Sequence, residues 1–201
     1  MFNLIRRDVI LQKRQLLIFI PFILFFIIME SHPALTFLVA SIFIPFNTLA
    51  YDEKTETNKL LNSLPYTRTE IMTARYVGAI VYMILSIALT SLLLFLFNKP
   101  FTLPDIAIGN SLFLLFVAIT FPLYQLIKPG YTTTVVIILF VVSAGLAGPF
   151  VSLINKYLPA ITEFIMNTPE SQLYTGVVLV VIIIYTISWA FSTFIYSRKV
   201  F

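Results

Sequence analysis

The stretch YDEKTETNKLLNSLPYTRTEIMTARY, residues 51–76, is the one long polar segment of a chain that is otherwise largely apolar. An apolar run precedes it at residues 34–50, and another follows it at residues 77–97. Each run approaches the ~20 residues that a helix needs to cross the hydrocarbon of a bilayer. The stretch is therefore predicted to be a polar loop between two membrane spans. Its charged residues are Asp52, Glu53, Lys54, Glu56, Lys59, Arg68, Glu70 and Arg75.

The composition of the whole chain places it in a membrane. Of the 201 residues, 59% are hydrophobic and 11% are charged, and the mean hydropathy is +0.97. Soluble domains carry about 45–50% apolar and about 25% charged residues. A water-soluble core could not hide this much apolar surface, so we expect an integral membrane protein. The absence of cysteine excludes disulfides and a thiol nucleophile.

Six apolar segments are candidates for transmembrane helices, which predicts an all-α, multi-pass protein with a single transmembrane domain over residues 1–201. The first segment is short and could also be re-entrant, although Lys13 and Arg14 can extend toward the interface and lengthen it. The spans are predicted at residues 16–29, 34–50, 77–97, 106–127, 131–154 and 174–196.

The positive charges predict the orientation of these spans. With a cytoplasmic amino terminus, eleven of the thirteen Lys and Arg residues lie inside, and only Lys99 and Lys156 lie outside. Lys and Arg favour the cytoplasmic side of short loops, so both termini are predicted to be cytoplasmic. Residues 1–14 place four cations around a partly apolar stripe, which favours an interfacial helix. A basic flank that only enforces the topology is the alternative. Glu30, His32 and Asp105 fall on the outer side.

The polar loop has more internal organisation than a spacer needs. Asp52 can cap a short helix that runs to about Leu64, and Pro65 ends it because proline lacks the N–H donor. Thr67-Arg68-Thr69-Glu70 fits a capping box that starts a helix leading into the next span. This first helix either docks on a partner or is simply solvated below the membrane. Its candidate docking face contains Leu60, Leu61 and Leu64.

These residues resemble the permease subunits of type-two ATP-binding-cassette (ABC) exporters. The resemblance extends over the six-span layout, the basic amino terminus and the ending YSRKVF. Within that family, the chain is most similar to short bacterial half-permeases that export amphipathic or antimicrobial peptides, such as phenol-soluble modulin and bacteriocin exporters. The matching residues are Asp52-Glu53, Leu60-Leu61-Asn62-Ser63-Leu64-Pro65, Thr67-Arg68, Glu70-Ile71 and Arg75-Tyr76.

The resemblance implies that residues 51–70 form a cytoplasmic coupling loop that rests on a separate ATP-binding subunit. It implies a dimeric permease, either two copies or this chain with a sister permease, with two ATPase subunits, in the bacterial plasma membrane. The exported substrate would be an amphipathic peptide or another hydrophobic or toxic compound. A secondary carrier or channel and a membrane scaffold or immunity protein stay open as alternatives. The implied coupling residues are Asp52, Glu53, Glu56, Leu60, Leu61, Leu64 and Arg68.

The residues predict no catalysis by this chain. His32 is the only histidine, so a spaced His–carboxylate metal site cannot form. A Gly-rich phosphate loop is also missing, so this chain is not expected to bind ATP. The resemblance implies that ATP and Mg bind to the partner ATPase, and nucleic acid is not an expected partner. Neutral polar residues within spans commonly bond neighbouring helices, and small residues let helices approach. The candidates for a pathway or a dimer seam are Ser41, Asn47, Thr48, Ser143, Gly145 and Gly148.

Overall fold

The computed structural model describes residues 13–54, 66–127, 130–159, 163 and 167–198. All regular structure within these ranges is helical, with no strand, which confirms the all-α prediction. The interfacial helix predicted at residues 1–14 falls almost entirely outside the described residues. The helices are α2 (Lys13–Ile28), α3 (Pro33–Lys54), α5 (Arg68–Leu96), α6 (Leu103–Leu126), α7 (Thr132–Tyr157) and α9 (Glu170–Arg198).

Four of these helices are long and apolar enough to cross a membrane. The qualifying segments are Pro33–Asp52, Arg68–Leu96, Leu103–Leu126 and Glu170–Arg198. They correspond to the second, third, fourth and sixth predicted spans. The first and fifth predicted spans lie on α2 and α7, whose apolar helical stretches, Leu17–Ile28 and Thr132–Ser143, are shorter. The count of six spans therefore stays a prediction.

The start of α5 follows the predicted local signal. Thr67 is the N-cap: its Oγ1 accepts a hydrogen bond from the Glu70 N–H at 3.2 Å, and Glu70 Oε2 accepts from the Thr67 N–H at 2.8 Å. The predicted capping box is confirmed, and it starts α5 nine residues before the predicted span. A second box, between Thr102 and Asp105, starts α6 in the same way.

The role predicted for Asp52 as the cap of a new helix is wrong. Helix α3 continues past residue 50 to Lys54, the last residue described before the loop, so Asp52 lies within α3 and does not start a new helix. The physical reason is the position of Arg75, whose guanidinium lies against the Asp52 carboxylate. The paired cation compensates the charge of a carboxylate that would otherwise be costly to bury within a helix.

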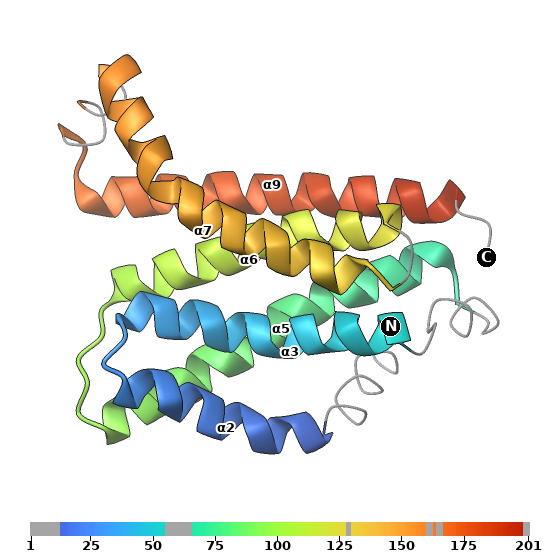
Figure 1. Ribbon diagram of the computed structural model, residues 1–201, viewed down its shortest axis with the longest axis horizontal. Coiled ribbons are helices and arrows are strands. Elements are labelled where there is room, and N and C mark those ends of the chain that lie inside the picture. Colours follow the sequence, from blue (N-terminus) through green and yellow to red (C-terminus); the bar gives the residue numbers. More distant parts are fainter. Residues whose placement is uncertain (1–12, 55–65, 128–129, 160–162, 164–166, 199–201) are drawn as a thin grey trace.

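The helices run side by side in alternating directions, and α7 lies across one face of the bundle (Figure 1). One apolar cluster fills the space between α5, α6 and α9, and includes Phe113, Val117 and Phe121. A second cluster joins α2, α3 and α5 around Phe37. Large apolar side chains such as Phe95 and Leu179 point outward, as expected for helices whose surroundings are lipid.

Helices α3 and α6 approach each other closely at Gly109. A Cβ atom at this position would lie 2.6 Å from the Ala34 carbonyl oxygen and 2.9 Å from Phe37 Cβ. Only a hydrogen atom fits there, as in other helix contacts built on small residues. Ser41 and Asn110 add a buried hydrogen bond of 3.2 Å between the same two helices.

Polar residues gather at the two ends of the bundle. At one end, Lys99 Nζ donates to Glu30 Oε1 at 2.7 Å, and this hydrogen bond and the ammonium charge lower the pKa of the Glu30 carboxyl. His32 Nδ1 lies 3.8 Å from Asp105 Oδ1 at the same end. The other end, which we call the loop end, holds the end of α3, the start of α5 and the end of α9 (Figure 1). Glu30, His32, Lys99 and Asp105 thus lie together, as predicted, whereas the cellular side of that end stays a prediction.

Candidate functional site

An ion pair joins the two helices that flank the polar loop. Arg75 Nη2 lies 2.9 Å from Asp52 Oδ2, and the two side chains are only 10% and 4% exposed. The Arg75 guanidinium also lies over the Tyr124 ring, 5.1 Å from its centroid, an arrangement that stabilises a cation. The end of α3, the first turns of α5 and the end of α6 are therefore held together at the point where the loop leaves the bundle.

A second contact attaches the far end of the loop to α9. Arg68 Nη1 donates to the carbonyl oxygen of Ser197 at 2.6 Å and to that of Tyr196 at 3.4 Å. The last carbonyls of a helix have no partner within the helix, and a cation placed there also complements the helix dipole. Arg68 thus caps the carboxyl end of α9 from the first position of α5. We call this contact and the Asp52–Arg75 pair the loop clamp.

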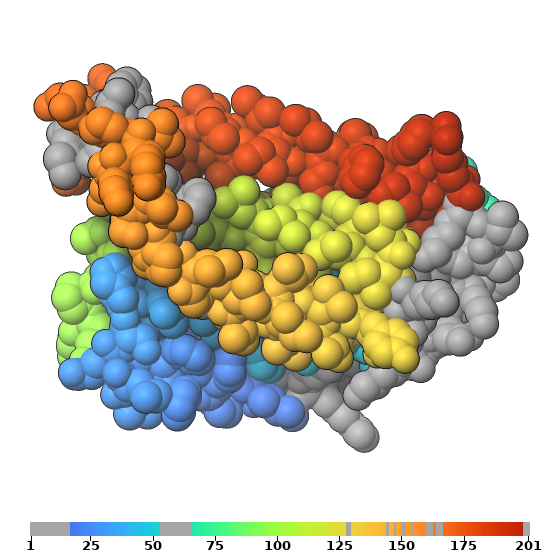
Figure 2. Space-filling model, turned by 45° about the horizontal axis from the view of Figure 1, so that its top comes forward, coloured from blue at the N-terminus to red at the C-terminus, as the bar shows by residue number. Residues whose placement is uncertain are grey.

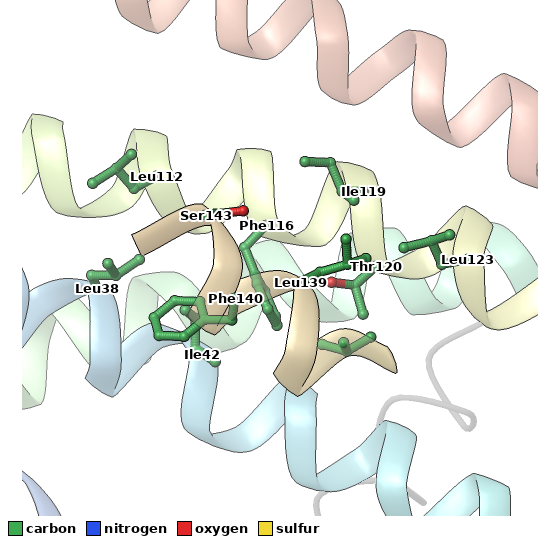
Figure 3. Close-up of a pocket in the computed structure, with 11 residues that line it drawn as sticks. Leu38, Ile42, Leu112, Phe116, Ile119, Thr120, Leu123, Leu139, Phe140 and Ser143 are labelled. Atoms are coloured by element: carbon green, nitrogen blue, oxygen red, sulfur yellow. The ribbon is translucent and has the colours of Figure 1, made fainter. Parts of the chain in front are cut away.

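An apolar hollow lies between α3, α6 and α7. It has a volume of about 300 Å³, and Leu38, Phe116 and Phe140 are among its lining residues. Figure 3 shows these side chains around the hollow, with Thr120 and Ser143 as the labelled residues that carry a hydroxyl. Such a hollow can receive an apolar group but supplies few hydrogen bonds to hold a polar one.

A second apolar hollow lies on the α2 side of α7. Its volume is about 490 Å³, and it shares Val136 and Phe140 of α7 with the first hollow while adding Phe22 and Phe26 of α2. In the space-filling view, α7 forms a band between α6 on one side and α2 and α3 on the other (Figure 2). Helix α7 is therefore bordered by open space along both edges of its contact with the bundle.

A family model of ABC-2 family transporter proteins matches residues 3–197. The chain belongs to this ABC-2 transporter family. A search of curated proteins and a search of solved structures found no match. As an ABC-2 protein, the chain is the membrane component of an ABC transporter, and it works with an ABC ATPase. Membrane components of this family are generally not catalytic.

The loop clamp contains two of the coupling residues that the sequence analysis named for this ABC-2 protein. Asp52 is buried in the ion pair, and Arg68 caps α9. Glu53 lies within α3, next to Asp52. Four other coupling residues lie outside the described part of the chain: Glu56, Leu60, Leu61 and Leu64.

The clamp also contains partners that the sequence analysis did not identify. The sequence shows Arg75 as a charge at the end of the polar stretch and as part of the family resemblance, without a partner, and it does not single out Tyr124 or Ser197. The sequence offered one signal for the Asp52–Arg75 pair: an acidic residue stands at one end of the loop and a basic residue at the other. The carbonyl of Ser197 gives no sequence signal, because every residue has one.

The six candidates for a pathway or dimer seam do not form a single site in this ABC-2 chain. Ser41 is fully buried and bonds Asn110, so it joins α3 to α6. Asn47 and Thr48 donate to carbonyls of their own helix, those of Phe43 and Ile44, at 2.7 and 3.0 Å.

The remaining three candidates lie on α7. Ser143 borders the 300 Å³ hollow. Gly145 and Gly148 face open space, since a Cβ at either position would meet no atom within 4 Å. Among the described residues, His, Asp and Glu side chains form no group of three that could hold a metal ion.

Proposed function

We propose that the chain is the permease subunit of a bacterial ABC exporter, with residues 51–70 as the loop that couples it to a separate ATPase. In this proposal α2 and α7 complete six spans, and both termini and the loop face the cytoplasm. The distribution of Lys and Arg supports that orientation. ATP and Mg bind to the ATPase, and this chain supplies the membrane path.

The observation that carries the proposal is the loop clamp. A partner can move membrane helices through a loop only if the ends of the loop are firmly attached to those helices. The Asp52–Arg75 pair joins α3 to α5 at the base of the loop, and Arg68 joins the start of α5 to the end of α9. Leu60, Leu61 and Leu64 provide the face that docks on the ATPase, and Glu53 and Glu56 contribute charge beside it. Asp52 and Arg68 act by holding the base of the loop.

The apolar hollows beside α7 support a hydrophobic or amphipathic substrate, such as a peptide with one apolar face. Their lining is rich in phenylalanine and contains no charged residue, so an apolar side chain is favoured there over a charged one. A second permease copy or a sister chain covers the open face of α7 at Gly145 and Gly148, where small residues permit close approach of two helices.

Co-purification tests the coupling role directly. The variant Leu61→Asp with Leu64→Asp is expected to lose the ATPase in mild detergent while still inserting in the membrane, because charge on the docking face opposes burial against the partner. Leu103→Asp is the matched control: this leucine is 81% exposed at the end opposite the loop, and its replacement is expected to retain the ATPase.

Three results would contradict the proposal. One is full retention of the ATPase by the double variant. The second is transport by the purified chain alone in liposomes, which would make it a secondary carrier or channel. The third is protection of cells against a peptide that persists without ATP hydrolysis, which would instead indicate a scaffold or immunity protein.

A further inference from the structure

One face of α9 is buried and is mostly polar. The buried side chains of this helix are spaced three or four residues apart, so they lie along a single stripe. Four of the five carry a hydroxyl group, which is costly to bury unless it is hydrogen-bonded. The stripe consists of Val181, Tyr185, Ser188, Ser192 and Tyr196.

The hydroxyl of Tyr76 connects this stripe to α5 and α6. It lies 2.8 Å from both Ser188 Oγ and Ser192 Oγ, and Ser188 Oγ donates to the carbonyl oxygen of Ala118 at 2.6 Å. Each hydroxyl has one proton to donate. Because the Ser188 proton goes to the Ala118 carbonyl, the donor in each of the other two bonds is determined. Ser192 donates to Tyr76, Tyr76 donates to Ser188, and Ser188 donates to α6. Tyr185 adds a bond of 2.8 Å to the carbonyl oxygen of Tyr76.

Two further contacts join α5 and α9 nearer the start of α5. Trp189 Nε1 of α9 donates to Thr73 Oγ1 of α5 at 3.2 Å, and Arg68 caps the end of α9 two turns from Tyr76. Three separate polar contacts therefore join the loop-end halves of α5 and α9. By contrast, the described contact of α7 with the bundle is bordered by the two apolar hollows.

The positions of the prolines distinguish α5 and α9 from the other described helices. The helical residues of α5 and α9 include no proline, whereas α2, α3, α6 and α7 each have one inside the helix. An internal proline removes a backbone hydrogen bond and bends or weakens a helix at that point. One part of α7 rises away from the other helices (Figure 1), and this helix contains Pro149. Helices α5 and α9 thus lack this source of bending, so each can move as a rigid unit.

We propose that Arg68 and Tyr76 are positioning residues that make α9 follow the loop, so that α5, α6 and α9 move as one body relative to α7. The inference rests on the proposed function, in which an ATPase moves the loop. Arg68 passes that displacement to the end of α9, and the Tyr76 hydroxyl fixes the register of α9 against α5 and α6. The energy of one such bond in a membrane is modest, but their geometry prevents one helix from sliding along another.

Distances between spin labels test this inference, and the cysteine-free chain allows labels at chosen positions. One pair joins exposed Leu96 of α5 to exposed Gln172 of α9, and a second joins exposed Tyr157 of α7 to Gln172. In the complex with its co-purified ATPase, trapping with an ATP analogue is expected to shift the Tyr157–Gln172 distance and leave the Leu96–Gln172 distance unchanged. A Leu96–Gln172 shift as large as the other would overturn the inference while leaving the coupling role of the loop intact.

Substitutions then identify the residues responsible. Tyr76→Phe and Arg68→Ala are expected to broaden the Leu96–Gln172 distance distribution and to lower the nucleotide-driven shift at α7, although the ATPase stays bound. Arg68→Lys is expected to recover most of the narrow Leu96–Gln172 distribution and most of the nucleotide-driven shift at α7, because a lysine can still cap helix carbonyls. Thr186→Val is the matched control, since this hydroxyl of α9 donates only to the Ile182 and Ile183 carbonyls of its own helix.

The chain alone, in lipid nanodiscs, provides a test that needs no ATPase. Tyr76→Phe is expected to broaden the Leu96–Gln172 distribution there as well, whereas Thr186→Val should leave it as in the unmodified chain. If Tyr76→Phe gives the same narrow distribution as Thr186→Val, Tyr76 does not fix the register of α9 and the inference is wrong, whatever the ATPase does.

Discussion

Arg75 illustrates how one side chain can set the local architecture of a membrane protein. Its guanidinium is nearly buried, pairs with Asp52 and lies over the ring of Tyr124. The charges of Arg75 and Asp52 were visible in the sequence, but they are 23 positions apart, and their contact depends on how α3 and α5 approach each other. Residue chemistry alone therefore identified charged candidates without identifying the pair.

Removal of Arg75 is expected to be costly. Arg75→Met takes away the cation while the Asp52 carboxylate stays buried, and breaking one side of such a pair lowers the free energy of unfolding by about 3–5 kcal/mol. Denaturant unfolding in micelles measures this loss. The double variant Arg75→Met with Asp52→Leu should recover most of the lost free energy of unfolding.

Arg198→Met is the control, because this exposed cation only stacks on Phe194 and contributes about 0.5–1 kcal/mol. Equal losses for the two arginines would contradict this account.

At the scale of single helices, local signals were readable and distant partners were not. Four consecutive residues from Thr67 were enough to predict the start of α5, because a capping box is made within one turn. The polar stripe of α9 was not predicted, because Ser188 and Ser192 bond Tyr76 at separations of 112 and 116 positions. Such residues resemble ordinary span serines until the packing of the helices is known. The continuation of α3 through Asp52 was missed for the same reason.

The contact between α3 and α6 gives a prediction at this scale. Gly109→Ala is expected to lower the free energy of unfolding by about 1–3 kcal/mol, the usual cost of an added methyl group in a packed interior. The methyl group would meet backbone of α3, which cannot move aside as a flexible side chain can. Gly176→Ala in α9 is the matched control, since its Cβ would enter open space. Thermal unfolding in nanodiscs compares the two, and a tolerated Gly109→Ala would show that the helices can separate without cost.

For the molecule as a whole, the separation of polar residues into two ends was predictable from hydropathy and charge. Alternating spans place Glu30, His32, Lys99 and Asp105 at one end, and the described structure has them together there. What composition could not predict is the uneven packing of the spans. Helix α7 borders two hollows while α9 is bonded to its neighbours, although both helices are strongly apolar.

The orientation of the molecule can be tested with single cysteines. Thr69→Cys at the loop end and Leu103→Cys at the opposite end both place a thiol at an exposed position. In intact cells, a membrane-impermeant maleimide is expected to label Leu103→Cys and to spare Thr69→Cys until the cells are opened, because the positive charges favour a cytoplasmic loop end. The reverse labelling pattern would refute the coupling role of the loop.

The Asp52–Arg75 ion pair has a consequence for how the sequence of the loop can change during evolution. Because Asp52 and Arg75 join α3 to α5 directly, the packing of these two helices does not depend on the sequence of the loop between them. If the loop couples to the ATPase as proposed, a new loop sequence that fits a different ATPase would leave the membrane helices unchanged.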